Sequence, residues 1–198
     1  MPPMMPVTKA LMLICVGMFC LGELWPYLMP WLALFPLASG YFLPWQPLSY
    51  ALLHGDMLHL FFNMLGLWMF GTELERVLGR KRYVQLLLAG VLSAAAVQLA
   101  FTAAIGSNVP TVGASGALFG LLLCFGMLFP DRIIMPLFPP IPMKAKVFVA
   151  VFGGLELLMG TGLLDMLFGG RGGNVAHFAH LGGMLGAYGL MRYWRRRR

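Results

Sequence analysis

Long apolar runs constrain this chain more than any other feature, because they leave little sequence from which a water-soluble domain could be built. Of its 198 residues, 60% are hydrophobic and 11% are charged, whereas soluble domains carry about 25% charged residues. A helix needs roughly 20 mainly apolar residues to cross the hydrocarbon core of a bilayer. The chain therefore accommodates about six spans with short loops, and we expect an integral membrane protein.

Charged residues, glycine and proline interrupt the apolar sequence and divide it into six expected spans. These spans cover residues 8–28, 50–72, 83–104, 113–129, 145–167 and 175–194. An uncharged connection rich in proline and aromatic residues covers 29–48, and a charged link covers 73–82. We predict an all-α fold, in which six transmembrane helices form a single membrane domain over residues 1–198.

The positive charges are distributed asymmetrically in this six-span arrangement. Of the 14 lysines and arginines, all but Arg171 fall on one side. Because basic residues are retained on the cytoplasmic side, both termini are expected there, and the compact form is typical of a bacterial inner-membrane protein. The net charge of +7 comes partly from the arginines at 195–198, directly after an apolar run. No basic groove interleaved with exposed aromatic residues is visible, so we expect lipid rather than nucleic acid as a partner.

One serine stands where an uncharged outer loop gives way to the fourth expected span. Ser115 is flanked by Gly113 and Gly116, which permit close approach of a substrate backbone. The unpaired N–H groups and positive dipole at a helix N-terminus suit a developing oxyanion. The segment thus indicates a nucleophile, and the alternative is a helix-capping serine in a glycine-rich contact.

The four histidines all belong to the second and sixth expected spans. His180 precedes a glycine stripe that lets the sixth span approach a neighbour closely. If that neighbour is the fourth span, the imidazole can reach Ser115 and act as general base. His177, nearer the surface, is the alternative base.

No carboxylate is apparent beside His180 in the sequence. Glu156 lies in the middle of the fifth expected span, where it could hydrogen-bond within the bundle, and we assign it no catalytic role. We therefore predict a Ser–His dyad held by packing rather than a triad.

Three blocks carry a resemblance to the rhomboid intramembrane serine proteases. They are HGDMLHLFFNM at 54–64, GASG at 113–116 and AHLGGMLG at 179–186, and the likeness covers about residues 50–190. It implies a six-helix rhomboid-like bundle that hydrolyses peptide bonds in or near transmembrane segments of other membrane proteins.

The resemblance also implies a role for each matching residue. Ser115 would be the nucleophile and His180 the general base. Five residues would support the reaction: His59 and Asn63 with the Ser115 backbone N–H as the oxyanion site, His54 at the outer end of the cavity, Gly113 in the active-site lining, and Phe119 against the His180 ring. The loop after the first span departs from many members, since it has Trp31 and Trp45 but no arginine.

Two other functions are compatible with parts of the sequence. The first is a non-catalytic rhomboid-like protein that binds membrane proteins. The second is a haem or metal protein that uses the four histidines, but HExxH is absent and the His-x4-His spacing does not suit one metal on a helix face. We expect no metal and no cofactor. The glycine-rich loop 169–173 and the fifth span are the expected movable gate.

Overall fold

The computed structural model describes residues 3–137, 140–161 and 176–197. This part of the chain is mostly helical, as predicted. Its longer α-helices are α1 (Pro6–Leu24), α4 (Met57–Gly66), α5 (Thr72–Ile105), α6 (Ser115–Leu128), α7 (Ala145–Gly160) and α9 (His177–Arg196). Shorter helical segments are α2 (Leu28–Leu32), η1 (Leu37–Ser39), α3 (Gln46–Ser49), η2 (Tyr50–Leu52) and the π-helix η3 (Leu67–Gly71). Between α6 and α7, β1 (Ile133–Ile134) pairs with β2 (Met143–Lys144) in antiparallel fashion.

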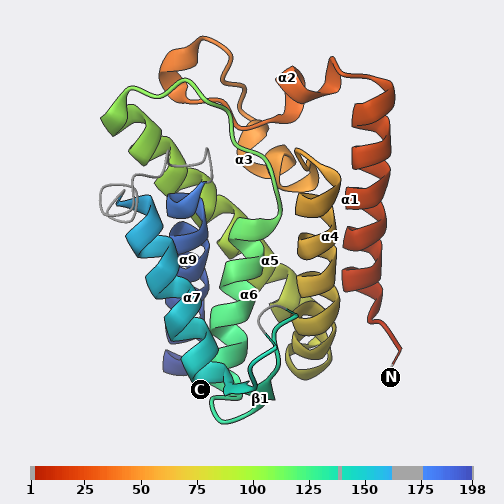
Figure 1. Cartoon of the computed structure of the whole chain (residues 1–198), viewed down its shortest axis with the longest axis vertical. Coiled ribbons are helices and arrows are strands. Elements are labelled where there is room, and N and C mark those ends of the chain that lie inside the picture. Colours follow the sequence, from red (N-terminus) through yellow and green to blue (C-terminus); the bar gives the residue numbers. More distant parts are fainter. Residues whose placement is uncertain (1–2, 138–139, 162–175, 198) are drawn as a thin grey trace.

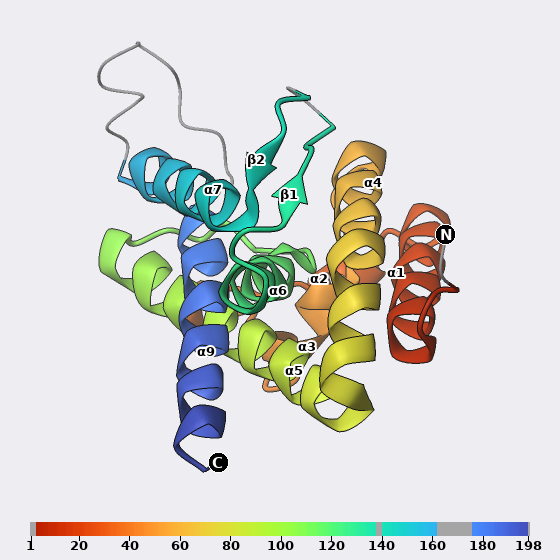
Figure 2. The ribbon, with the colours of Figure 1, turned by 90° about the horizontal axis from the view of Figure 1, so that it is seen from below.

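Helix α6 lies at the centre of the bundle (Figures 1 and 2). It packs against α5, α9, α7 and α4, while α1 lies at the edge against α4, η3 and α5. Both ends of the described chain lie at the lower end of the molecule in Figure 1. Helices α6 and α9 run in the same direction, because Gly116 contacts Ala179 and Gly120 contacts Ala187, further along both helices. Both helices begin at the upper end of the molecule in Figure 1.

The second expected span, 50–72, differs from a single helix. Residues 53–56 leave the helical conformation between η2 and α4, so His54 lies outside α4 rather than on its face. The cause is Asp56, whose carboxylate accepts a hydrogen bond from the His59 N–H at 2.8 Å and caps a new helix at Met57. A side chain that satisfies a free N–H in the first turn fixes where a helix begins.

The charged link at 73–82 is helical and belongs to α5, apart from a break at Gly79. There φ is 73°, a left-handed conformation that glycine adopts without the steric cost that a Cβ would bring. The chain changes direction at this residue. Glycine thus allows the turn between the α4–η3 segment and the apolar part of α5 without a loop.

A buried carboxylate fixes α1 against α5. Glu75 is fully buried and accepts hydrogen bonds from the backbone N–H groups of Val7 and Thr8 at 2.9 and 2.8 Å. It accepts a third from the Thr8 hydroxyl at 2.9 Å. The first N–H groups of a helix have no partner within the helix, so Glu75 caps α1 from a distant segment.

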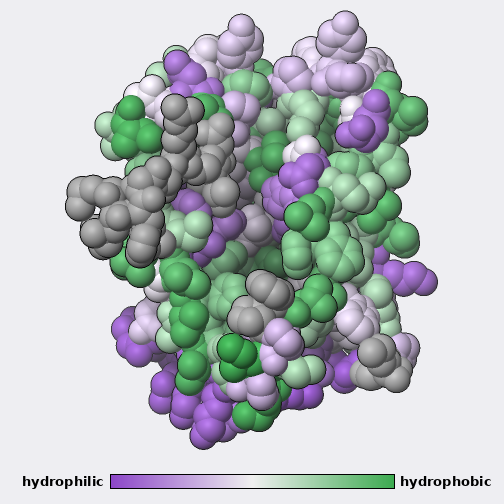
Figure 3. Space-filling view, in the orientation of Figure 1, coloured by the Kyte–Doolittle hydropathy of each residue, from purple (hydrophilic) through white to green (hydrophobic). Residues whose placement is uncertain are grey.

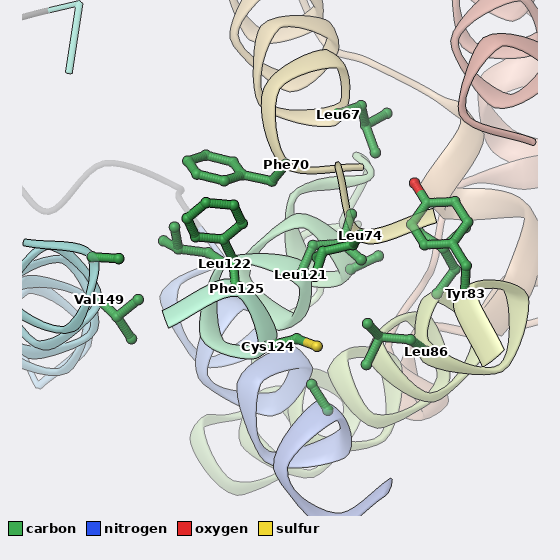
Figure 4. Packing of buried hydrophobic residues seen from close by; sticks show 14 of the residues in the cluster. Leu67, Phe70, Leu74, Tyr83, Leu86, Leu121, Leu122, Cys124, Phe125 and Val149 are labelled. Carbon is green, nitrogen blue, oxygen red and sulfur yellow. The ribbon is translucent and has the colours of Figure 1, made fainter. Parts of the chain in front are cut away.

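Close contacts between glycines join α6 to α9. A side-chain carbon at Gly120 would lie 2.9 Å from the Gly183 carbonyl oxygen, and one at Gly116 would lie 3.3 Å from the Ala179 carbonyl oxygen. Small residues let two helix backbones approach to this extent. Figure 4 shows the side chains on other faces of α6, including Leu121 and Phe125, packed among residues of η3, α5 and α7. The backbone contact fixes the register of α6 against α9.

The outer surface of the bundle is apolar. Leu13, Leu21 and Leu24 on α1 are 63%, 51% and 83% exposed. In Figure 3, hydrophobic side chains cover the middle of one face and strongly hydrophilic ones gather at its lower end. Within the described residues, two stretches are long and apolar enough to cross a membrane, Pro6–Leu24 and the kinked Met57–Ile105. These features are typical of a helical membrane bundle, and the number of six spans remains a prediction.

The connection at 29–48 is tied to the segment before α6. The Gln46 amide is fully buried, accepts a hydrogen bond from the Phe35 N–H at 3.1 Å and donates one to the Tyr41 carbonyl at 3.0 Å. Leu34 and Thr111 exchange two backbone hydrogen bonds of 2.9 Å. The expected loop is therefore an ordered cover that holds the chain just before Ser115.

Candidate active site

Ser115 is the first residue of α6, and a glycine with a positive φ just before it sets its position. Gly113 has φ of 122°, a value that favours glycine, and its N–H donates to the Tyr50 carbonyl at 2.9 Å. The chain turns there into α6. The half-buried Ser115 side chain thus lies beside the first N–H groups of the helix, which lack partners within it.

His180 on α9 is the histidine that contacts this serine. Its Nε2 lies 2.7 Å from Ser115 Oγ, and the residue is buried. In the tautomer with a bare Nε2, the hydroxyl donates to the ring and the ring can take its proton. Phe119, one turn further along α6, stacks on the imidazole with centroids 4.4 Å apart and an interplanar angle of 9°. The structure therefore brings Ser115, His180 and Phe119 together.

His59 of α4 faces the same small space as Ser115, and Asn63 lies one turn further along α4. A side-chain carbon at Gly113 would lie 2.7 Å from His59 Nε2 and 3.6 Å from Ser115 Oγ, so both groups face the same small space. Asn63 is buried, and its amide donates to the His59 carbonyl at 2.9 Å. The amide carries a second N–H. His59 thus brings a potential donor to the space beside Ser115, and Asn63 lies on the next turn of α4.

His54 supports this group by packing. It is 4% exposed, and its ring lies edge-on to that of His59 with centroids 5.1 Å apart. Neither of its ring nitrogens has a hydrogen-bond partner among the residues that the structure describes. His54 therefore restricts the His59 ring from the segment before α4.

A carboxylate does lie beside His180, and this corrects the expectation that none would. Glu156 Oε2 on α7 is 2.8 Å from His180 Nδ1 and 2.7 Å from His177 Nδ1. The contact with His177 has hydrogen-bond geometry. The contact with His180 has the distance but not the angle, so His180 Nδ1 has no aligned hydrogen bond within the described chain. His177, the alternative base, points its Nδ1 at Glu156, and it is His180 that contacts the serine.

The sequence did contain a signal for Glu156. An ionisable side chain within an apolar span is costly and normally has a polar partner, and the histidines of the sixth span were the available candidates. What the sequence lacks is the register between α7 and α9, which decides whether Glu156 faces α9 or lipid. The expected gate loop at 169–173 lies outside the described residues.

Glu156, His177 and His180 are also the one group in the described ranges with metal-ligand character, since their ligand atoms lie within 4.8 Å of one another. Zinc bonds of about 2.0–2.1 Å would place tetrahedral ligands about 3.3 Å apart. The observed spacings of 2.7 and 2.8 Å are hydrogen-bond lengths. These spacings are shorter than two ligands of one tetrahedral zinc ion would have, and His54 and His59 do not belong to the group.

Comparison with known proteins finds a rhomboid-domain family model that matches residues 42–197. The mitochondrial Rhomboid protein 1 of Saccharomyces cerevisiae is 34% identical over 143 residues, which cover 71% of this chain and 38% of that protein. Rhomboid protease GluP of Bacillus subtilis is 30% identical over 144 residues, covering 73% and 25%. Rhomboid protease GlpG of Serratia proteamaculans is 28% identical over 191 residues, covering 96% and 62%. The matched regions thus span less than two thirds of each relative.

Proposed function

The chain belongs to the rhomboid family of integral membrane proteins, and from that premise we propose that it is an intramembrane serine endopeptidase. Its substrates would be membrane proteins, cut in or near a transmembrane segment. The observation that carries this proposal is the 2.7 Å contact between Ser115 Oγ and His180 Nε2 at the start of two tightly packed helices. A capping serine would need no imidazole at that distance.

The reaction follows from these two groups. His180 takes the hydroxyl proton at Nε2 while Ser115 Oγ attacks the carbonyl carbon of the scissile bond. When the tetrahedral intermediate collapses, the C–N bond breaks and the amine leaves with the proton held by His180. A water molecule then gives a proton to the same ring and attacks the acyl carbon. When this second intermediate collapses, the bond between Ser115 Oγ and the acyl carbon breaks, His180 returns the proton to Oγ, and the acid is released.

The negative charge on the carbonyl oxygen needs hydrogen-bond donors. We assign this role to the backbone N–H of Ser115, to His59 in the neutral tautomer that carries its proton on Nε2, which faces Gly113, and to the Asn63 amide on the next turn of α4. Such preorganised donors stabilise charge that develops in the transition state, and removal of one costs about 10²–10³-fold in rate. The helix dipole of α6 acts in the same direction.

An apolar cavity indicates where a substrate helix enters. It has a volume of about 440 Å³ and lies between α4, α6 and α7. Its lining includes Phe62 and Gly66 from α4, Phe152 from α7, and Phe119. Since Phe119 also stacks on His180, the cavity ends next to the reacting groups. A segment that unwinds there would present its backbone to Ser115, and movement of α7 would act as the gate.

We propose six spans with both termini in the cytoplasm of a bacterial cell. The two termini lie at the same end of the molecule in Figure 1, on opposite sides of it, and the exposed arginines of 195–197 lie at that end. Ser115 and His180 begin helices at the opposite end, so water would reach them from the outer side of the membrane.

The test is covalent labelling of the purified chain by a serine-reactive fluorophosphonate. The wild-type protein should be labelled, whereas Ser115→Ala and His180→Ala should not. A cooperative thermal unfolding transition would show that both variants are folded. His177→Ala removes the other histidine of α9 and should still be labelled, although more slowly than the wild type, because His177 hydrogen-bonds the Glu156 carboxylate that lies beside His180. A non-catalytic binding role would be favoured if Ser115→Ala retained the cellular function. Labelling that survives His180→Ala but not His177→Ala would overturn the choice of base.

A further inference from the structure

We propose that Glu156 is a positioning residue for His180, so that Ser115, His180 and Glu156 act in sequence across α6, α9 and α7. This inference rests on the proposed function. Its starting point is a carboxylate oxygen 2.8 Å from the Nδ1 of the ring whose Nε2 contacts the serine. The two ring nitrogens of His180 thus face two different functional groups.

The packing of α7 on α9 holds Glu156 in this position. A side-chain carbon at Gly160 would lie 3.1 Å from His177 Cβ, and one at Gly153 would lie 3.1 Å from the end of Met184. The contacts run in opposite directions along the two helices, which therefore pack antiparallel. Glu156 lies between the two glycines, on the same side of α7. Close approach on both sides directs its side chain at α9.

His177 fixes the carboxylate in turn. It makes an aligned hydrogen bond of 2.7 Å from the same helix that carries His180, one turn away. The side chains are well covered, with 14% of Glu156 and 10% of each histidine exposed. A carboxylate that is covered to this extent has few side-chain conformations available to it. His177 thereby restricts Glu156 to the place beside His180.

The role of Glu156 is electrostatic. When Ser115 transfers its proton to Nε2, the His180 ring becomes positively charged while its Nδ1 keeps a proton. A carboxylate at 2.8 Å attracts that charge more strongly in this sheltered site than in water, and it favours the tautomer that leaves Nε2 free. Glu156 gains no proton, and no bond to it forms or breaks.

The test separates charge from shape. Glu156→Gln keeps the size of the side chain and an oxygen that can accept from His177, but it loses the charge. We expect kinact for fluorophosphonate labelling of the full chain to fall by about 10- to 100-fold, with KI unchanged, since a positioned acid–base group contributes about 10²–10⁴-fold. Glu156→Asp keeps the charge at a greater distance, and its kinact should fall by about threefold to tenfold. The aspartate variant also decides the matter if the glutamine variant does not fold.

Glu75→Gln is the matched control, because it neutralises a buried carboxylate far from the serine. It should lower the unfolding temperature and leave kinact unchanged. The inference is overturned if Glu156→Gln or Glu156→Asp is labelled with the wild-type kinact, or if Glu75→Gln loses as much. Labelling of Ser115→Ala at the wild-type rate would instead refute the proposed function, so the two failures are distinguishable.

Discussion

Replacement of Gly183 with alanine should disable the site without altering any of its polar side chains. Gly183 lies on α9, three residues beyond His180, where the helix backbone contacts that of α6. An added methyl carbon would overlap the Gly116 carbonyl oxygen, and it would lie 2.5 Å from the carbonyl carbon and 3.1 Å from the Cα of the same residue. These atoms belong to helix backbone and cannot rotate away. The two helices must therefore separate.

The magnitude follows from the contact distances. Carbon atoms in proteins pack at about 3.5–4.0 Å, so α6 and α9 would move apart by at least about 1 Å to relieve the contact with the Gly116 carbonyl group. The 2.7 Å contact between Ser115 Oγ and His180 Nε2 would lengthen to about 3.7 Å, beyond the usual hydrogen-bond range. A misplacement of about 1 Å costs about 100-fold in rate. Overpacking should also lower the free energy of unfolding by about 1–3 kcal/mol.

The assay is the rate of fluorophosphonate labelling, measured below the unfolding transition of each variant. Gly189→Ala is the matched control, because this glycine is on the same helix and an added carbon there meets no atom within 4 Å. It should be labelled like the wild type and gain up to about 1 kcal/mol of stability from helix propensity. Wild-type labelling of Gly183→Ala, or an equal loss in Gly189→Ala, would refute the argument that this contact sets the site.

Three further predictions concern single side chains. Phe119→Ala should slow labelling by about tenfold, because the stacked ring no longer fixes His180, whereas Phe119→Tyr keeps the ring and should stay within about threefold of wild type. Glu75→Gln should lower the free energy of unfolding by about 1.5–3 kcal/mol, seen as a lower midpoint in a thermal or denaturant titration, because the charged cap of α1 is lost. Gly113→Ala should reduce labelling by at least about tenfold. The new carbon would lie 2.7 Å from His59, and the backbone conformation at this position is strained for alanine. Unchanged labelling would show that this turn tolerates a side chain.

Much of the site could be predicted from the sequence because depth in a membrane can be deduced from charge. The basic residues set an orientation, and the orientation placed Ser115 and His180 near the same end of their helices. In the structure the two residues are in contact. The glycines of the sixth span indicated close packing, and Gly183 lies against Gly116 and Gly120 of α6. Gly182 and Gly186 instead lie against α5, and Gly189 contacts neither helix. The pattern of charged residues thus indicated the depth of Ser115 and His180, and the pattern of small residues indicated the close packing of the helices.

The remaining features depend on contacts between distant segments. Asp56 ends one segment and begins α4, so His54 left the helix on which the apolar pattern had placed it. Apolar character extends across residues 50–72 and gives no sign of that break. Local capping prevailed over hydrophobicity, because a helix start is fixed by the N–H groups that a side chain satisfies.

The buried carboxylate of Glu75 and the partly buried one of Glu156 illustrate the same limit most clearly. Glu75 and Glu156 are chemically identical, yet the first meets two backbone N–H groups and a hydroxyl, and the second meets two imidazoles. Donors of the first kind keep their protons throughout a reaction, so Glu75 can only hold α1 in place. An imidazole that accepts a proton from Ser115 changes its charge, so a carboxylate beside it affects the transition state more than the resting protein. The groups that surround a carboxylate therefore decide whether it has a structural role or can act in catalysis. These groups are known only once the register of the packed helices is known.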